Sequence, residues 1–301
     1  MYKAQRNLPF RKIENLDFPK IVQVQTVSYC NGRCIMCPYF HVHDKLSHGQ
    51  MSDELYKKVI DECANHDVAE FKPFLMNEPL LDNKLCNRLV YARLKLPKAK
   101  IGFSTNGVLL NEKIANELCD TQLDELWFNF SGNTATTYNK VMRGLDFDTV
   151  RNNIINFSKL AAQKGSKMSI NISMVEIKDN IPEIDDSINF WKDYNVSVHP
   201  IPYNNRGGNS DEINIKVLDN VIGRRVCDKP TNKICILYNG EVVLCPSDWE
   251  RKNILGDVSK STIKDVWNGD ERRRYINYIM NCEYERIELC KNCDFPLLYK
   301  E

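Results

Sequence analysis

Between about residues 21 and 202, short apolar runs rich in β-branched residues alternate with longer segments whose apolar positions recur every three or four residues. The short runs are typical of buried strands, and the longer spacing is typical of amphipathic helices. We predict six strands, at 21–27, 71–76, 100–105, 125–130, 168–175 and 196–201. We predict five helices between them, at 52–66, 83–94, 111–119, 147–164 and 181–194, with Ser52 as the cap of the first.

Strands that alternate with helices pair in parallel through right-handed crossovers. The predicted fold class is therefore α/β, with a parallel sheet that is either open or closed into a barrel. In barrels of this kind the chemistry gathers at the carboxyl ends of the strands.

The pattern changes after the sixth predicted strand. A polar, glycine-containing stretch at 204–212 reads as a linker. Beyond it, two apolar runs at 233–238 and 241–245 flank Asn239 and Gly240, which predicts a β-hairpin, and helices follow from about 262 and over 272–280. We expect an N-terminal extension over 1–20, a barrel-like domain over 21–203, a linker over 204–226 and a small C-terminal domain over 227–301.

Composition narrows the class of protein. The 301 residues are 43% hydrophobic, enough for a globular core, and the formal net charge of +1 argues against nucleic acid as a bulk electrostatic partner. No apolar run approaches the roughly 20 residues needed to span a bilayer, and the N-terminus has no signal-peptide core. We expect a soluble, cytoplasmic protein with no membrane partner.

Twelve cysteines are unusual for such a chain, and in a reducing compartment they point to metal ligation more than to disulfides. Cys30, Cys34 and Cys37 crowd into eight residues after the first strand. Three thiolates on one loop can hold three irons of a cubane cluster and leave the fourth without a protein ligand. The alternatives are a zinc site or inert buried thiols.

The spacing of these three cysteines resembles the signature loop of the radical S-adenosylmethionine (SAM) superfamily. The resemblance implies a partial (β/α)6 barrel of TIM-like type with a [4Fe-4S] cluster on this loop. It also implies that SAM chelates the open iron and is cleaved by one electron to methionine and a 5′-deoxyadenosyl radical, which abstracts a substrate hydrogen. Tyr39, just beyond the loop, is expected either to face the adenine or to belong to the core.

Three further strand ends resemble the family. Asn77-Glu78-Pro79 is similar to its Gly-Glu-Pro turn, with Asn77 in place of the usual glycine, and Ser104-Thr105-Asn106-Gly107 and Ser131 follow the next two strands. Each segment alone reads equally well as an ordinary turn, but their order on successive strands favours the family. The resemblance implies these cofactor-binding residues: Tyr39, Asn77, Glu78, Thr105, Asn106, Ser131 and Arg143.

A second set of cysteines resembles the SPASM domain, in its shortened "twitch" form with one auxiliary cluster. The resemblance makes four cysteines the ligands of a second [4Fe-4S] cluster: Cys227, Cys245, Cys290 and Cys293. Four thiolates occupy every iron, so this cluster has no open iron at which SAM could bind. A zinc ribbon is the alternative. Cys235 and Cys282 are left over. Each is expected to be a replacement ligand, a packing thiol, or a free thiol that returns a hydrogen atom to a substrate radical, with packing favoured.

The reaction itself stays open at this stage. We expect a radical SAM oxidoreductase that dehydrogenates or epimerises a small molecule such as a sugar or aminocyclitol, reduced by a flavodoxin or ferredoxin. The alternative is modification of a ribosomal peptide, although the roughly 20 residues before the first strand are too few for the peptide-recognition domain common in such enzymes. A non-catalytic metal-binding or redox-sensing protein is the remote alternative.

Overall fold

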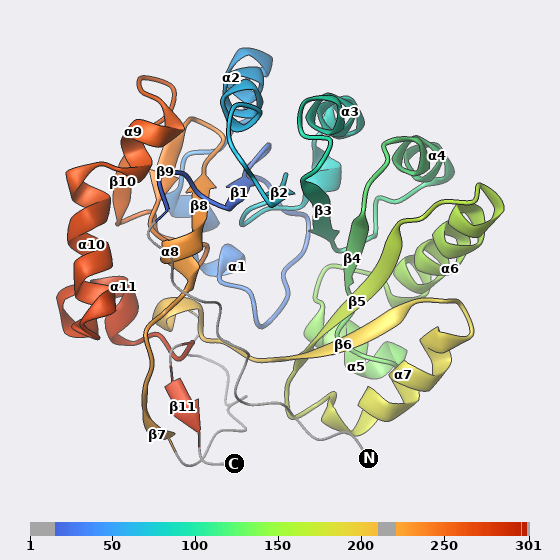
Figure 1. Ribbon diagram of the computed structural model, residues 1–301. Helices are drawn as coiled ribbons and strands as arrows, with labels where there is room; N and C mark the ends of the chain where they lie inside the picture. The colour runs from blue at the N-terminus through green and yellow to red at the C-terminus, as the bar shows by residue number, and fades with distance from the viewer. Residues whose placement is uncertain (1–15, 210–220, 296, 300–301) are drawn as a thin grey trace.

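The computed structural model describes residues 16–209, 221–295 and 297–299. Most of the predicted extension 1–20 and positions 210–220 of the predicted linker lie outside the described residues. Within them, nine strands form one sheet in the order β10-β9-β8-β1-β2-β3-β4-β5-β6 (Figure 1). The six strands predicted for the barrel are all present: β1 (Ile21–Val24), β2 (Glu70–Lys72), β3 (Lys100–Thr105), β4 (Glu125–Asn129), β5 (Ser169–Glu176) and β6 (Ser197–Pro202).

Every neighbouring pair from β1 to β6 is parallel, as predicted. The five predicted helices are confirmed, with ends shifted by a few residues, and they line the outer side of the curved sheet (Figure 1). Ser52 caps the first of them by accepting a hydrogen bond from Leu55 N at 3.1 Å. These helices are α2 (Asp53–Cys63), α3 (Leu85–Lys95), α4 (Glu112–Asp120), α6 (Phe147–Gln163) and α7 (Ile184–Lys192).

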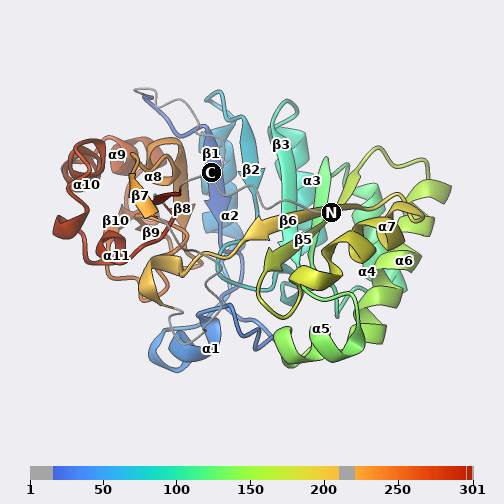
Figure 2. The ribbon, with the colours of Figure 1, turned by 90° about the horizontal axis from the view of Figure 1, so that it is seen from below.

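Two short helices that the sequence pattern did not predict follow strand ends: α1 (Tyr39–Val42) after β1 and α5 (Ala135–Val141) after β4. Figure 2 shows both at the same end of the strands, which is the carboxyl end of the parallel sheet. Single 3-10 turns complete the connections: η1 (His43–Lys45), η2 (Pro79–Leu81), η3 (Ile181–Glu183), η4 (Arg206–Gly208) and η5 (Tyr284–Arg286).

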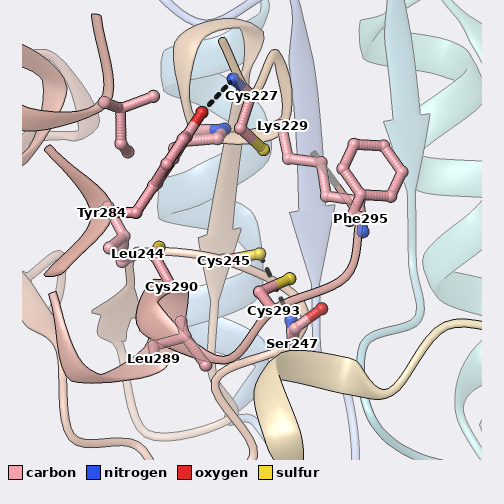
Figure 3. Close-up of a pocket in the computed structure, with 12 residues that line it drawn as sticks. Cys227, Lys229, Leu244, Cys245, Ser247, Tyr284, Leu289, Cys290, Cys293 and Phe295 are labelled. Carbon is pink, nitrogen blue, oxygen red and sulfur yellow. Dashed lines mark hydrogen bonds between the residues drawn. The ribbon is translucent and has the colours of Figure 1, made fainter. Parts of the chain in front are cut away.

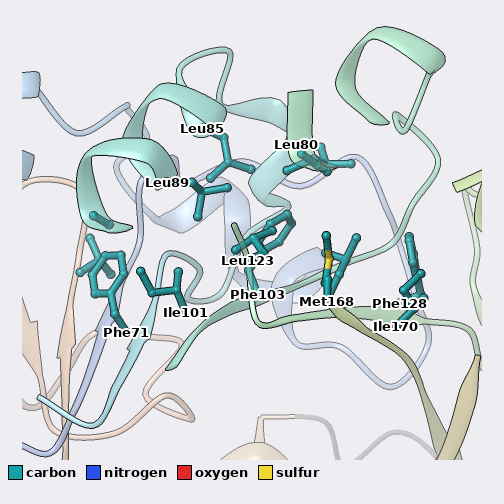
Figure 4. Close-up of a cluster of buried hydrophobic side chains, with 14 of the residues drawn as sticks. Phe71, Leu80, Leu85, Leu89, Ile101, Phe103, Leu123, Phe128, Met168 and Ile170 are labelled. Carbon is teal, nitrogen blue, oxygen red and sulfur yellow. The ribbon is translucent and has the colours of Figure 1, made fainter. Parts of the chain in front are cut away.

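The barrel strands alternate between an apolar outer face and a more polar inner face. Phe71, Phe103 and Phe128 are fully buried in the layer between the sheet and the helices (Figure 4). Burying each such side chain contributes about 1.5–3 kcal/mol. The intervening side chains point to the barrel interior, where Ser104 and Asn129 line a cavity.

The predicted hairpin forms, and it extends the barrel sheet. Strands β8 (Lys233–Ile236) and β9 (Glu241–Val243) pair antiparallel around Gly240, whose φ of +96° favours glycine. Strand β8 pairs in parallel with β1, and β10 (Ile254–Asp257) adds to the far edge. The small C-terminal domain expected from the sequence therefore shares a sheet with the barrel.

The remaining C-terminal helices lie on the same side of the molecule as this hairpin (Figure 1). Glu62 of α2 accepts hydrogen bonds from Ile263 N at 2.8 Å and Lys264 N at 2.9 Å, which satisfies two free N–H groups at the start of α9. No helix in the described ranges is long and apolar enough to cross a membrane. The elements are α8 (Lys229–Asn232), α9 (Ile263–Trp267), α10 (Asp270–Met280), α11 (Glu288–Lys291) and a two-stranded sheet of β7 (Val221–Arg224) and β11 (Leu297–Tyr299).

Candidate active site

The first three cysteines lie together on the loop that joins β1 to α1. Burial raises the pKa of the Cys30 thiol to about 12, and the neighbouring Cys37 thiol adds to the rise. Burial also raises the pKa of Cys34, with contributions from both of the other thiols, so the three share one small volume. A positively charged iron cluster reverses this effect, because metal ligands bind as thiolates and release their protons.

Main-chain hydrogen bonds from the end of α5 fix the cysteine loop. Arg33 N donates to Arg143 O at 2.7 Å, and Ile35 N donates to Val141 O at 2.9 Å. Gly144, with φ of +81°, turns the chain immediately after this contact. The structure thus gives Arg143, predicted as a cofactor-binding residue, a main-chain role in holding the loop.

Glu78 connects two of the predicted SAM-binding turns. Its buried carboxylate accepts hydrogen bonds from Leu80 N at 3.0 Å, Thr105 Oγ1 at 2.5 Å and Asn106 N at 2.7 Å. The Asn106 side chain in turn donates to Asn31 Oδ1 at 2.7 Å, inside the cysteine loop. Burial raises the pKa of Glu78 to about 7, despite these three donors. The structure therefore brings Glu78, Thr105 and Asn106 together as one hydrogen-bonded framework next to the cysteine loop.

The other predicted cofactor residues surround the same strand ends. Ser131 Oγ accepts from Val175 N at 3.0 Å, which ties the end of β4 to β5. Asn77 Oδ1 accepts from Leu75 N at 2.7 Å, while its buried Nδ2 has no hydrogen-bond partner in the described structure. Met76, one residue earlier, has a φ of 54°, in the left-handed region. Tyr39 stacks on the His43 ring with centroids 5.4 Å apart.

A cavity of about 450 Å³ lies in the barrel interior next to these turns. Inner-face residues of the strands line it, and Cys37 and Asn77 border it at the carboxyl end. Arg206, after β6, and Trp249, after the hairpin, also line it. The Arg206 guanidinium lies close enough to Cys37 to oppose, in part, the rise that burial causes in the pKa of that thiol.

Sequence reasoning missed this inner lining. Polar residues at every second strand position carry the signal, for example Gln23 and the pair Trp127 and Asn129 on β4. Arg206 lies in the segment predicted as a linker, so no pattern marked it.

The second set of four cysteines surrounds a separate cavity, which Figure 3 shows in close-up. Cys227 and Cys245 lie before and after the β8–β9 hairpin, whereas Cys290 and Cys293 come from α11 and the turn after it. Burial raises the pKa of Cys227 to about 12 and also raises that of Cys290 and Cys293, with added repulsion from the other thiols of the set. Tyr284 OH accepts a hydrogen bond from Cys227 N at 2.9 Å.

Both cysteine sets fit iron–sulfur clusters. Within the described residues, no three His, Cys, Asp or Glu side chains are placed to hold one metal ion together. The four C-terminal thiols instead line a space, as expected for ligands that each hold a different iron of a cluster. A single tetrahedral zinc ion needs sulfurs that converge at about 2.3 Å from one point.

The two leftover cysteines lie outside both cavities. Cys235 on β8 is 1% exposed and packs in an apolar cluster with Leu75, Leu237 and Val243. Cys282 is exposed just after α10 and has a φ of 56°. Neither borders the barrel cavity, and the hydrogen-atom donor role stays a prediction for both.

Comparison with known families agrees with this geometry. A family model described as the radical SAM superfamily matches residues 24–190. The chain belongs to the radical SAM superfamily. A second model, the SPASM iron–sulfur cluster-binding domain, matches residues 227–294 of this radical SAM enzyme and includes the four cysteines that line the C-terminal cavity.

Individual relatives align with this enzyme over nearly its whole length. It is 24% identical to an S-adenosyl-L-methionine-dependent 2-deoxy-scyllo-inosamine dehydrogenase of Niallia circulans over 91% of this chain and 92% of the relative. The crystal structure of BtrN in complex with AdoMet and 2-DOIA is similar with a TM-score of 0.64 and 20% identity, over 91% of this chain and 92% of that one. Streptococcus suis SuiB bound to the precursor peptide SuiA is similar with a TM-score of 0.71 and 15% identity, over 93% of this chain but 72% of SuiB.

The cofactors of the radical SAM enzyme are thus a SAM-binding [4Fe-4S] cluster, an auxiliary iron–sulfur cluster and SAM. We propose that Cys30, Cys34 and Cys37 hold the first cluster and that the four thiols of the C-terminal cavity hold the second. When bound and reduced, the first cluster supplies the electron that cleaves SAM, and the chain supplies the framework of turns around it.

Proposed function

We propose that this enzyme oxidises an alcohol group of a small molecule to a carbonyl group. One observation carries the proposal: the barrel cavity extends from Cys37 of the first cysteine set to Pro246 and Trp249, in the loop that follows Cys245 of the second. A substrate in this cavity lies between the two cluster sites. The near-complete overlap with the inosamine dehydrogenase in both chains supports the same class of reaction.

Oxidation of a secondary alcohol removes one hydrogen atom from carbon, one proton from the hydroxyl group and one further electron. In our proposal the hydrogen atom passes to the 5′-deoxyadenosyl group and the proton to water in the open cavity. A cluster held by the four thiols of the C-terminal cavity would supply the acceptor for the electron. The chain itself orients the alcohol through the polar side chains of its inner strand face, among them Ser104, Asn129 and Ser173.

Several finer assignments belong to this proposal. We place the auxiliary site in the single-cluster twitch form, with a [4Fe-4S] cluster, because the chain offers four thiols around one cavity. We propose the domain boundaries 21–203 and 227–301, with 204–226 between them. A flavodoxin or ferredoxin in the cytoplasm is the proposed reductant, since SAM cleavage needs one low-potential electron.

Modification of a ribosomal peptide is the second candidate. The TM-score of 0.71 with SuiB, bound to its precursor peptide, favours it. The 72% coverage of SuiB shows that SuiB contains further structure, which has no counterpart in the matched region.

The test is anaerobic turnover of the enzyme with both clusters reconstituted. The enzyme, SAM and a chemical reductant are incubated in D2O with a panel of polyols, amino sugars and short peptides. We expect one carbonyl product for each 5′-deoxyadenosine formed, with no deuterium at the oxidised carbon. A redox-neutral epimer that carries solvent deuterium, or a modified peptide in place of a carbonyl product, would contradict the proposal.

A matched pair of variants isolates the auxiliary site. Cys290→Ser should lower the carbonyl yield per 5′-deoxyadenosine, because the acceptor for the second electron is lost. Cys119→Ser, a partly exposed cysteine on α4, serves as the control and should leave the yield unchanged.

A further inference from the structure

Two residues that the SAM-binding turns do not include line the barrel cavity near Cys37, and we call this part of the cavity its corner. The Arg206 guanidinium acts electrostatically on the Cys37 thiol, and the Trp249 ring lies 6.5 Å from the ring of Tyr39, two residues after Cys37. Arg206 reaches the corner from η4, after β6, and Trp249 reaches it from the loop after β9. Cys37 and Pro246 line the same cavity. The corner therefore lies where a substrate would meet the loops that carry both cysteine sets.

Arg206 is the charged side chain of this cavity that has no ion-pair partner among the described residues. The other charged side chains of the cavity are paired, Lys72 with Glu70 at 3.1 Å and Glu125 with Lys100 at 2.7 Å. Across the described residues the Arg206 guanidinium takes part in no hydrogen bond or ion pair.

A second group in the corner also lacks a partner. The Trp249 Nε1–H is buried and has no hydrogen-bond partner in the described part of the chain. Guanidinium and indole N–H groups only donate, so the corner offers donors and needs acceptor atoms. Planar, bidentate recognition of a carboxylate or phosphate is what a guanidinium does best.

The backbone holds Arg206 in place from the side of the auxiliary site. Arg206 has a φ of 52°, a left-handed conformation that is uncommon for a residue with a side chain. Just before it, Asn205 N donates to both carboxylate oxygens of Asp294 at 3.0 Å, and the Asn204 side chain donates to the same carboxylate. Asn205 Nδ2 donates to Asn292 O at 2.7 Å.

These contacts connect Arg206 to the loop that carries Cys293 at the auxiliary site. Asn292 and Asp294 flank Cys293, a proposed ligand of the auxiliary cluster. The hydrogen bonds around Asn205 therefore fasten the segment that carries Arg206 directly to that loop.

We propose that Arg206, together with the Trp249 indole N–H, binds an anionic group of the substrate, a carboxylate or a phosphate. The inference rests on the proposed function in taking this cavity as the substrate site, and it narrows the substrate to a polyol that carries an acidic group. Asn205 is a positioning residue for Arg206. The carboxylate of SAM is the competing source of the same chemistry, and the experiment separates the two.

The experiment measures binding by equilibrium dialysis to the anaerobic holoenzyme with oxidised clusters and saturating SAM. The probes are matched six-carbon polyols: neutral glucitol, gluconate and glucitol 6-phosphate. At least one anionic probe should bind about 10-fold or more tightly than glucitol, and Arg206→Gln should weaken it about 10- to 100-fold. Arg206→Lys should retain part of the preference, because it keeps the charge and loses the fork.

Controls separate positioning and SAM binding from general damage. Arg274→Gln removes an exposed arginine that pairs with Glu271 at 2.5 Å, and it should bind every probe as the wild type does. Asn205→Ala should weaken anion binding less than Arg206→Gln does, with unchanged iron content and unchanged SAM affinity.

Three results would overturn the proposal: equal or undetectable binding of anionic and neutral probes, full anion preference in Arg206→Gln, or a matching loss of SAM affinity in that variant. The last result would assign Arg206 to the SAM carboxylate. If the anion preference holds but no bound polyol is oxidised, the proposed function fails and the anion site stands.

Discussion

Replacing Gly132 with alanine should disturb both the fold and the active site. Gly132 follows Ser131 where β4 leads towards α5. A Cβ at this position would lie 2.6 Å from Tyr138 N and 2.8 Å from Tyr138 Cα. Ordinary contacts begin at 3.4 Å, so the main chain of α5 has to move by about 0.8 Å, the difference between 3.4 and 2.6 Å.

The movement has two consequences. Tyr138 is fully buried against Phe130, with ring centroids 4.6 Å apart, so a shift of α5 strains the core. The end of the same helix, through Val141 O, and the turn after it, through Arg143 O, hold the cysteine loop. Overpacking of this kind costs about 1–3 kcal/mol.

The assay combines urea unfolding of the iron-free protein with 5′-deoxyadenosine formation by the reconstituted enzyme. Gly132→Ala should lower the free energy of unfolding by about 1–3 kcal/mol and the melting temperature by roughly 2–10 °C, and it should slow SAM cleavage. Gly223→Ala is the matched control, because an added Cβ there meets nothing within 4 Å. If Gly132→Ala unfolds within about 0.5 kcal/mol of the wild type and cleaves SAM at the same rate, the reasoning is refuted.

Three further predictions follow from the buried groups. Burial raises the pKa of Glu78 from 4.5 to about 7, so its contribution to stability is full below pH 4.5 and is lost as the pH rises towards 7. In urea unfolding of the iron-free protein, the stability advantage of the wild type over Glu78→Gln should shrink across this window by at most about 3 kcal/mol. A difference that stays constant with pH would contradict this prediction. Cys235→Ala trims a buried thiol and should cost about 1 kcal/mol in chemical unfolding with product formation intact, whereas loss of turnover with continued SAM cleavage would support the hydrogen-atom donor role. Iron analysis should give about eight irons per chain in the reconstituted wild type and about four in Cys34→Ala or Cys290→Ala, and zinc in their place would count against both clusters.

The local patterns of the sequence predict the barrel well, because each of its strands and helices has its own hydrophobic period. The parallel pairing of the strands follows from the alternation of strands and helices. The pairing of β8 with β1 joins segments more than 200 residues apart, and no local pattern encodes it.

Some residues of the candidate site could be predicted from local sequence, and others could not because they depend on tertiary packing. Cysteine spacing marks the proposed ligands, since chelation by a loop needs thiols that are close in sequence. The cofactor-binding role of Glu78 stays a prediction; the three hydrogen bonds that its carboxylate accepts depend on the packing of distant turns, which no local pattern encodes. Arg206 sits in a polar, glycine-containing stretch, and only the contact of Asn205 with Asp294 shows that this stretch is fastened into the site.

The central claim is that three thiolates leave one iron free for SAM, and hyperfine spectroscopy tests it most directly. Electron–nuclear double resonance of the reduced enzyme with SAM labelled with ¹⁵N at the amino group should show ¹⁵N coupling to the cluster in the wild type and in Cys290→Ala, and none in Cys34→Ala. A wild-type spectrum without ¹⁵N coupling, from a cluster with four protein ligands, would contradict the account.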